Sequence, residues 1–136
     1  MSNTKPSQLA AYSDLFDRLL DSSLLLEFET LKIIDANPAA ERLFQTTAIL
    51  QKTLLDLSDP TQKDLILKNI RMSKRRYYPH QFECPWKISE TNAKLMQISA
   101  CILKLSNNTE VIQIIAKDIT AERELEQKSK AYLDFL

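Results

Sequence analysis

The stretch IIDANPAAERLF, residues 33–44, carries the strongest structural signals in the sequence. Its beginning is short and apolar, which predicts a strand. Asn37 is a preferred N-cap residue, and Pro38 suits the first helical position because the N–H that it lacks would have no partner there. Glu41 falls in the first turn, where the positive end of the helix dipole stabilises an acidic side chain. The stretch therefore predicts a short strand and then a short helix that ends near Gln45.

Downstream of this stretch, apolar residues recur at every second position, which is the period of a half-buried strand. This pattern predicts three strands, over residues 77–88, 93–105 and 111–117. Tight polar turns separate them, so they should pair antiparallel. Two shorter strands are predicted at residues 24–28 and 32–36. The sequence thus predicts an α+β domain built on one antiparallel sheet.

Further helices are predicted on either side of these strands. One begins after Ser7 and ends near residue 21, a second covers residues 59–73, and a third covers residues 121–136. The middle helices should cover one face of the sheet. The first helix carries an apolar stripe at spacings of three and four, which its own domain or a second chain must cover. Its members are Leu9, Tyr12, Phe16 and Leu19.

The composition excludes several classes of function. The chain has 136 residues, 44% of them hydrophobic, and its 18 basic and 18 acidic residues cancel. A general nucleic-acid binder would have a basic excess, so we expect no nucleic-acid partner. Glycine is absent, which rules out a phosphate-binding loop, a dinucleotide-binding turn and a nucleophile elbow. With no membrane-length apolar run and no signal peptide, we expect a cytoplasmic chain, or a cytoplasmic piece of a larger one, that does not insert into a membrane.

The cysteine and histidine residues predict neither a metal site nor a catalytic one. Cys84 and Cys101 are far apart and lack the spacing of a zinc motif, so we expect them to be small buried apolar residues. His80 is the sole histidine in the sequence, and no carboxylate spacing completes a metal site or a catalytic triad around it. We therefore predict no metal and no enzymatic activity for this segment, although a longer protein would carry an effector domain.

Two segments resemble the signature motifs of PAS domains. Residues 33–44 resemble the first motif, a short strand leading into an Asn-capped helix with two alanines. Residues 111–120, VIQIIAKDIT, resemble the last strand with its closing Asp-Ile-Thr. The resemblance covers residues 22–120 and implies a five-stranded antiparallel sheet in the order 2-1-5-4-3 with short helices on one face. It leaves residues 1–21 as a tail and flanking helix, and residues 121–136 as a C-terminal helix that we expect to be truncated.

The chain departs from the family pattern at its glycines. Gln45 stands where a glycine usually follows the first motif helix, and Asn107 or Asn108 replaces the glycine of the last hairpin. Asparagine tolerates positive φ better than most residues, so we expect it to form that turn. The loop geometry after Gln45 is left open.

The resemblance implies a ligand pocket between the sheet and the helices. Alternating large apolar side chains on a strand are also typical of an ordinary core, which is the reading we favour. Flavin-binding members carry a Gly-Arg-Asn-Cys run that is absent here, and haem-binding members usually use a helical histidine, whereas His80 lies in a predicted strand. We therefore expect neither flavin nor haem. The candidate pocket residues are Phe44, Ile70, Phe82, Trp86, Met96 and Ile98.

A basic run follows the helix predicted over residues 59–73. Lys74, Arg75 and Arg76 are typical of a solvated helix C-terminus, where cations complement the helix dipole. We favour that interpretation over a nucleic-acid surface. The alternative is a small anionic metabolite contacted by Arg75 or Arg76.

Asp118 and Thr120 lie where the last strand becomes a helix. Thr120 is predicted to cap the helix that starts at Ala121. In PAS domains the matching residues tie the exit helix to the sheet, so the resemblance implies that Asp118 and Thr120 relay a signal at this junction.

The resemblance implies a sensory and dimerising module of a bacterial-type signalling protein, responding to a small molecule of unknown identity or to a protein partner. Residues 130–136 resemble the entry to the dimerisation helices of sensor histidine kinases, so we expect that effector. A cyclic-dinucleotide synthase is the alternative effector. We also expect a homodimer, for which the stripe of Leu9, Tyr12, Phe16 and Leu19 offers interface candidates. The same stripe fits a ligand-free interaction scaffold equally well.

Overall fold

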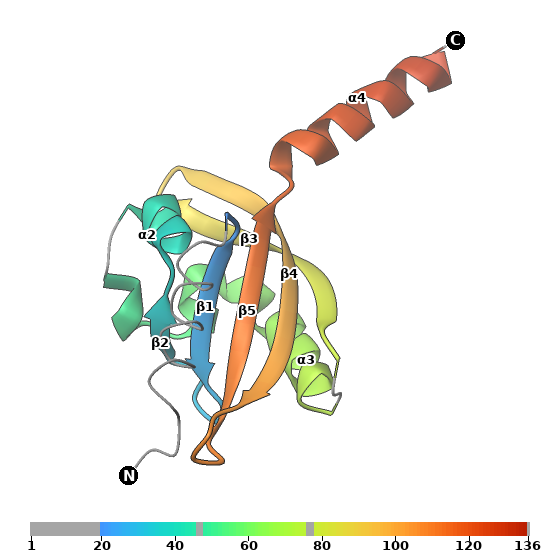
Figure 1. Cartoon of the computed structure of the whole chain (residues 1–136). Helices are drawn as coiled ribbons and strands as arrows, with labels where there is room; N and C mark the ends of the chain where they lie inside the picture. The colour runs from blue at the N-terminus through green and yellow to red at the C-terminus, as the bar shows by residue number, and fades with distance from the viewer. Residues whose placement is uncertain (1–19, 46–47, 76–77, 136) are drawn as a thin grey trace.

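The computed structural model describes residues 20–45, 48–75 and 78–135, and a single antiparallel sheet forms its centre (Figure 1). The strands lie in the spatial order β2-β1-β5-β4-β3, and every neighbouring pair is antiparallel. The predicted five-stranded sheet and its strand order are therefore confirmed. In chain order the strands are β1 (Ser22–Glu27), β2 (Ile33–Ala36), β3 (His80–Ser89), β4 (Asn92–Lys104) and β5 (Glu110–Asp118).

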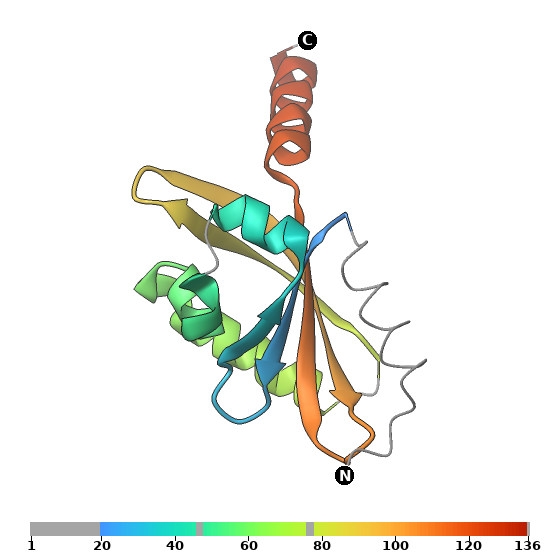
Figure 2. The same cartoon turned by 60° about the vertical axis from the view of Figure 1, so that its left-hand side comes forward.

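Helices α2 (Pro38–Phe44) and α3 (Lys63–Lys74) pack on one face of this sheet (Figure 2). Between them run three short 3-10 helices, η1 (Ala48–Gln51), η2 (Leu54–Leu57) and η3 (Pro60–Gln62). Helix α4 (Thr120–Phe135) follows β5 and extends away from the sheet (Figures 1 and 2). The order of elements therefore agrees with the sequence prediction over the described residues.

The helix predicted over residues 59–73 begins in a different form. Asp59 Oδ1 accepts a hydrogen bond from Thr61 N at 3.0 Å, so Asp59 caps the 3-10 turn η3. The α-helix itself starts at Lys63. A proline at the first position fits either kind of helix, because its absent N–H falls among the unpaired donors of the first turn.

The hydrophobic core lies between the sheet and helices α2 and α3. Leu24 of β1 faces Ile114 of β5, and Ala100 of β4 faces the same isoleucine from the other side. All three are fully buried. A buried leucine or isoleucine contributes roughly 1.5–3 kcal/mol relative to an exposed one, so this face supplies most of the stability. The opposite face has a smaller apolar cluster formed by Leu25, Val111 and Leu103.

Glycine is absent from this chain, and three of its described residues have positive φ. Gln45 ends α2 at φ 56°, and Asn108 turns the β4–β5 hairpin at φ 66°. These are two of the positions where PAS domains usually have glycine. The third is Leu31 in the β1–β2 turn, at φ 62°. The left-handed conformation costs an ordinary residue about 1–2 kcal/mol, which burial of the Leu31 side chain offsets.

Helix α4 differs from the rest of the fold because it buries none of its described side chains. Its large apolar residues stand out from the helix, with Leu125 exposed by 66%, Tyr132 by 65% and Phe135 by 89%. Among the described residues, no helix combines the length and the apolar character needed to span a bilayer.

Candidate functional site

The N-terminus of α2 is fixed to the start of β1 by Asn37, whose side chain is fully buried. Asn37 Oδ1 accepts hydrogen bonds from Ala40 N at 3.0 Å and from Ser23 N at 2.9 Å. Its Nδ2 donates to Asp21 O at 3.0 Å. Asn37 thus occupies the N-cap position of α2 and also joins α2 to the sheet, because one amide group serves both elements.

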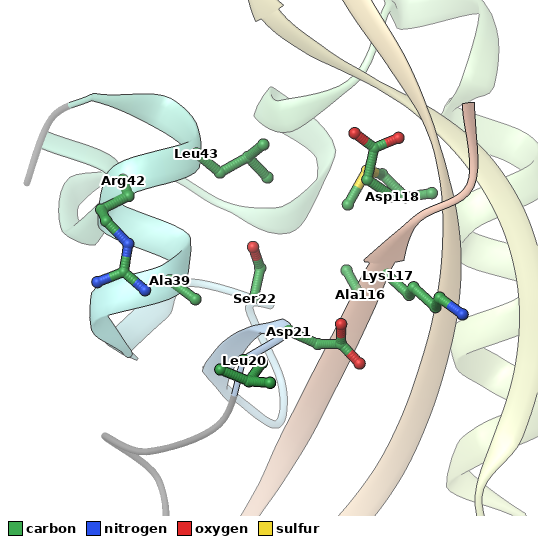
Figure 3. A pocket seen from close by; sticks show the side chains of 10 residues that line it. Leu20, Asp21, Ser22, Ala39, Arg42, Leu43, Ala116, Lys117 and Asp118 are labelled. Carbon is green, nitrogen blue, oxygen red and sulfur yellow. The ribbon is translucent and has the colours of Figure 1, made fainter. Parts of the chain in front are cut away.

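A cavity of about 440 Å³ opens between α2, the start of β1 and the end of β5 (Figure 3). We call it the α2–β5 cavity. Asn37 fixes the separation of two of its walls, since it binds both α2 and β1. Apolar side chains and four charged residues share its lining. The lining residues are Leu20, Asp21, Ser22, Ala39, Arg42, Leu43, Met96, Ala116, Lys117 and Asp118.

The hydroxyl group of Ser22 points into this cavity (Figure 3). Ser22 is exposed by only 6%, and its hydroxyl makes no hydrogen bond within the described part of the chain. A hydroxyl directed into a cavity can bind water or a ligand, since it has one donor and two acceptor sites.

The charged residues around the cavity differ in their partners. Lys117 Nζ lies 3.5 Å from Glu122 Oε1, and Lys94 Nζ lies 3.1 Å from Asp118 Oδ2. Asp21 and Arg42 make no ion pair with any residue that the structure describes. One carboxylate and one guanidinium at the rim are therefore available to other molecules.

Asp118 connects the cavity to the start of α4. Its Oδ1 accepts a hydrogen bond from Thr120 N at 3.0 Å, and its Oδ2 accepts one from Lys94 Nζ. Burial on its own would raise the pKa of the Asp118 carboxyl. The hydrogen bonds from Thr120 and the nearby charge of Lys94 outweigh burial and hold that pKa below its ordinary value.

The structure corrects the predicted role of the Thr120 side chain. Helix α4 begins at Thr120 itself, and Thr120 Oγ1 accepts a hydrogen bond from Leu95 N on β4 at 2.9 Å. Thr120 is therefore not the side-chain cap of a helix starting at Ala121. The pairing of β4 with β5 ends at Met96, so the N–H of Leu95 lies beyond the ladder and needs another acceptor.

Two further contacts hold the first turn of α4 to the sheet. Ile119 N donates to Leu95 O at 2.9 Å. The guanidinium of Arg123 forms an ion pair with Glu83 of β3, and this pairing raises the pKa of Arg123. Both contacts join the first turn of α4 to the β3–β4 hairpin, and the ion pair of Lys117 with Glu122 joins the same turn to β5.

The six pocket residues predicted from the sequence lie together, but as packed core. Phe44 and Trp86 have ring centroids 5.6 Å apart, and Trp86 is fully buried. The indole N–H of Trp86 has no hydrogen-bond partner among the described residues. Ile70, Met96 and Ile98 belong to the same cluster, and Phe82 packs against it. Met96 alone of the six lines the α2–β5 cavity, and ligand binding by the other five stays a prediction.

The remaining candidates among the described residues lie apart from the cavity. Arg75 is exposed just after α3, and Arg76 is outside the described residues. His80 is buried in β3, where its Nε2 lies 2.8 Å from Asn69 Oδ1 of α3. Cys84 is buried on the core face, and burial raises the pKa of its thiol.

Two further predictions concern the dimer interface and metal binding. The stripe of Leu9, Tyr12, Phe16 and Leu19 lies outside the described residues, so its role stays a prediction. Over residues 20–45, 48–75 and 78–135, no cluster of three or more histidine, cysteine or acidic side chains is arranged to hold a metal ion.

Sequence reasoning missed the polar residues of the cavity. Asp21 precedes β1 and Ser22 is the first residue of β1. A polar residue at such a position is usually interpreted as the end of a loop. Arg42 lies within the stretch that decides the fold, and Ala39, Arg42 and Leu43 share one side of α2 at spacings of three and four. That spacing was the available signal, but it does not reveal which strand ends lie opposite.

Solved PAS domains share this fold. A PAS domain from Colwellia psychrerythraea superposes with a TM-score of 0.72 at 16% identity, covering 83% of this chain and 98% of that one. A domain of a sensory box sensor histidine kinase/response regulator from Geobacter sulfurreducens gives 0.65 at 19% identity, covering 79% and 92%. An RNA-binding light-oxygen-voltage receptor gives 0.74 at 15% identity, covering 98% of this chain and 40% of that one.

The comparisons by sequence add no closer relationship. No family model and no curated protein matches the sequence. The structural similarities occur at identities below one fifth. They show that the chain has the PAS fold, and sensor histidine kinases are among the proteins that share it.

Proposed function

We propose that this chain is a cytoplasmic signal-sensing and dimerising PAS module that passes a change in its sheet through α4 to a histidine kinase. The chain binds and relays, and the effector supplies the catalysis. A cyclic-dinucleotide synthase as effector is the second form of the same proposal.

The junction between β5 and α4 is the observation that carries this proposal. Asp118, Ile119 and Thr120 make hydrogen bonds to Lys94 and Leu95 of β4. Beyond Arg123, the described part of α4 makes no ion pair or side-chain hydrogen bond to the described residues of the sheet, and none of its side chains is buried. A helix held at one end only takes its direction from that end, so a shift in β4 is amplified along its length.

The apolar residues of α4 favour pairing with a second copy of the chain. Leu125 and Tyr132 are seven residues apart, which is the repeat of a two-stranded coiled coil. Both are about two-thirds exposed, and an amphipathic helix with an exposed apolar stripe is stabilised when a partner covers it. The stripe of Leu9, Tyr12, Phe16 and Leu19 in the N-terminal segment is a second candidate for the dimer interface.

A chimera with a histidine kinase tests the relay. Residues 1–136 are joined to the dimerisation and catalytic region of a kinase, and one to seven residues are inserted after Leu136. If α4 continues into a coiled coil, autophosphorylation should rise and fall with a seven-residue period. Each inserted residue rotates the apolar face of the helix entering the kinase by a fixed angle relative to α4. Activity that is indifferent to the insertion length contradicts the relay and supports a ligand-free scaffold.

Two variants complete this experiment. Thr120→Val removes the hydrogen bond to Leu95 and should flatten the periodic response, whereas Thr91→Val in the exposed β3–β4 turn should leave it unchanged. Replacing Leu9 and Phe16 with glutamate should give monomers in analytical ultracentrifugation. A dimer that survives this double change places the interface elsewhere.

A further inference from the structure

We propose that the α2–β5 cavity binds a small protonated amine with an apolar substituent, whose ammonium group lies among Ser22, Asp21 and Asp118. Binding of the amine to the cavity does not depend on signal relay through α4. The role of this amine as the signal of the module rests on the proposed function.

The volume and the apolar walls of the cavity suit a compact, partly apolar molecule. Its volume of about 440 Å³ lies within the range of roughly 300–1,000 Å³ typical of small-molecule sites. Ala39 and Leu43 of α2 form one apolar wall, and Met96 and Ala116 of the sheet form the other. The side chain of Leu43 points across the gap toward β5 (Figure 3).

Ser22 provides the observation that points to a ligand. Its hydroxyl is directed into the cavity and has no hydrogen-bond partner in the described chain, and the residue as a whole is exposed by only 6%. A hydroxyl oxygen has two acceptor lone pairs, so it can accept from the N–H of an ammonium group.

The charges that border the cavity favour a cation over an anion. In Figure 3 the ends of the Arg42 and Lys117 side chains point away from the space between α2 and β5. Lys117 is also paired with Glu122. Asp21 and Asp118 line the same space, and Asp21 has no ion pair among the described residues. A hydrogen bond between charged groups in a partly desolvated site is stronger than a neutral one.

Such a ligand would act on the junction directly. Asp118 accepts from Lys94 and from Thr120 N, so an ammonium ion near Asp118 competes with Lys94 for one carboxylate. Occupation of the cavity would therefore change the contact that joins β4 to the start of α4. Met96 and Ala116 line the cavity and also belong to the core cluster that contains Trp86, so the cavity borders the packed interior.

Three probes that share one branched carbon chain test the head group. Isoamylamine, isoamyl alcohol and isovalerate are titrated into the protein at pH 7, with binding followed by calorimetry and by amide shifts of Ser22, Leu43 and Ala116. We expect isoamylamine to bind at least about tenfold more tightly than the alcohol, and isovalerate not to bind. Equal binding of amine and alcohol, tighter binding of isovalerate, or no binding of the amine overturns the proposal.

Variants locate the ammonium group. Asp21→Asn and Ser22→Ala should each weaken isoamylamine binding at least fivefold, on the order expected for one lost charge-assisted bond. Asp64→Asn on the exposed side of α3 removes the same charge and should have no effect. Arg42→Gln removes a neighbouring cation and should leave binding unchanged or tighter. Weaker binding in Arg42→Gln identifies an anion site and overturns the proposal.

A filled cavity separates this proposal from the proposed function. Ala39→Leu places a larger side chain in the cavity and should abolish amine binding, with the fold checked by its amide spectrum. Amine binding that persists in this variant contradicts the site. Amine binding without any change in the output of the kinase chimera contradicts the relay and leaves the site intact. If the output of the chimera varies with a seven-residue period but the protein does not bind the amine, the site is contradicted and the relay stands.

Discussion

Helices α2 and α4 begin in similar ways and then differ in what stabilises them. The seven-residue α2 starts at a fully buried Asn37 and buries Ala39 and Ala40 against the core. The sixteen-residue α4 starts at a junction held by Asp118 and Thr120 and buries none of its described side chains. A helix as short as α2 is stable through tertiary packing, whereas α4 depends on its own length and its first turn.

This difference separates the packed core of the domain, which includes α2, from the C-terminal helix α4. A helix that belongs to the core cannot rotate without unpacking it, because protein interiors are closely packed. A helix that touches the sheet only at its first turn can change direction at the cost of a few hydrogen bonds. The comparison predicts that damage to the start of α2 affects the whole fold, and that damage to the start of α4 stays local.

The largest effect is expected for Asn37→Ala. The substitution removes the acceptor of Ser23 N and Ala40 N and the donor to Asp21 O in a buried place. Unpaired buried donors and a lost cap together should lower the free energy of unfolding by about 3 kcal/mol, measured by urea denaturation. Asn92→Ala, on the exposed first residue of β4, is the matched control and should change it by less than about 0.5 kcal/mol. A loss below about 1 kcal/mol would mean that α2 is not joined to β1 in this way.

A smaller and more local effect is expected for Thr120→Val. The change leaves the Leu95 N–H without its acceptor and should cost about 1–2 kcal/mol. Hydrogen exchange at Leu95 and Ile119 should become about tenfold faster, since about 1.4 kcal/mol corresponds to a factor of ten. Exchange in α2 should stay as it was. Thr120→Ser keeps the hydroxyl and should behave as the unchanged protein, and equal acceleration in α2 would contradict a local role.

The smallest effect is expected in the pH dependence of the stability that Asp118 contributes. The pKa of Asp118 is lower in the folded protein than in the unfolded chain, where it is about 3.9. Its stabilisation is therefore fully present above about pH 4 and is lost as the pH falls through the lower folded value. The melting temperature of Asp118→Asn should lie below that of the unchanged protein at pH 6, and the two should converge as the pH falls from about 4 through the folded pKa of Asp118. Lys94→Met should reduce the difference at pH 6, and a gap that widens in acid would refute the assignment.

The sequence predicted the backbone of this domain well because its signals are local. Asn37 before Pro38 specified where α2 begins, and the two-residue period after residue 77 specified three paired strands. The tolerance of asparagine for positive φ predicted the last turn at Asn107 or Asn108, and Asn108 is the one with positive φ. Leu31 was not predicted, because leucine has no intrinsic preference for positive φ and the burial of its side chain depends on distant parts of the chain.

The candidate site was predicted less well because its parts come from distant segments. Met96 was named as a pocket residue, yet the other five candidates fill the core between the sheet and α2 and α3. Ser22 and Asp21 became part of a cavity because β1 lies beside β5 and below α2. Periodicity identifies the face on which a side chain lies, but it cannot show whether the opposite element fills the space in front of it.

The amino-acid sequence by itself determined the strands, the cap of α2 and the antiparallel hairpins, since each depends on residues a few positions apart. Tertiary structure alone decided that the Thr120 hydroxyl bonds to a backbone group 25 residues away, and that Ser22, Leu43 and Asp118 face one cavity. The physical reason is that hydrogen bonds and cavities between distant segments exist only after the strands have taken their order in the sheet.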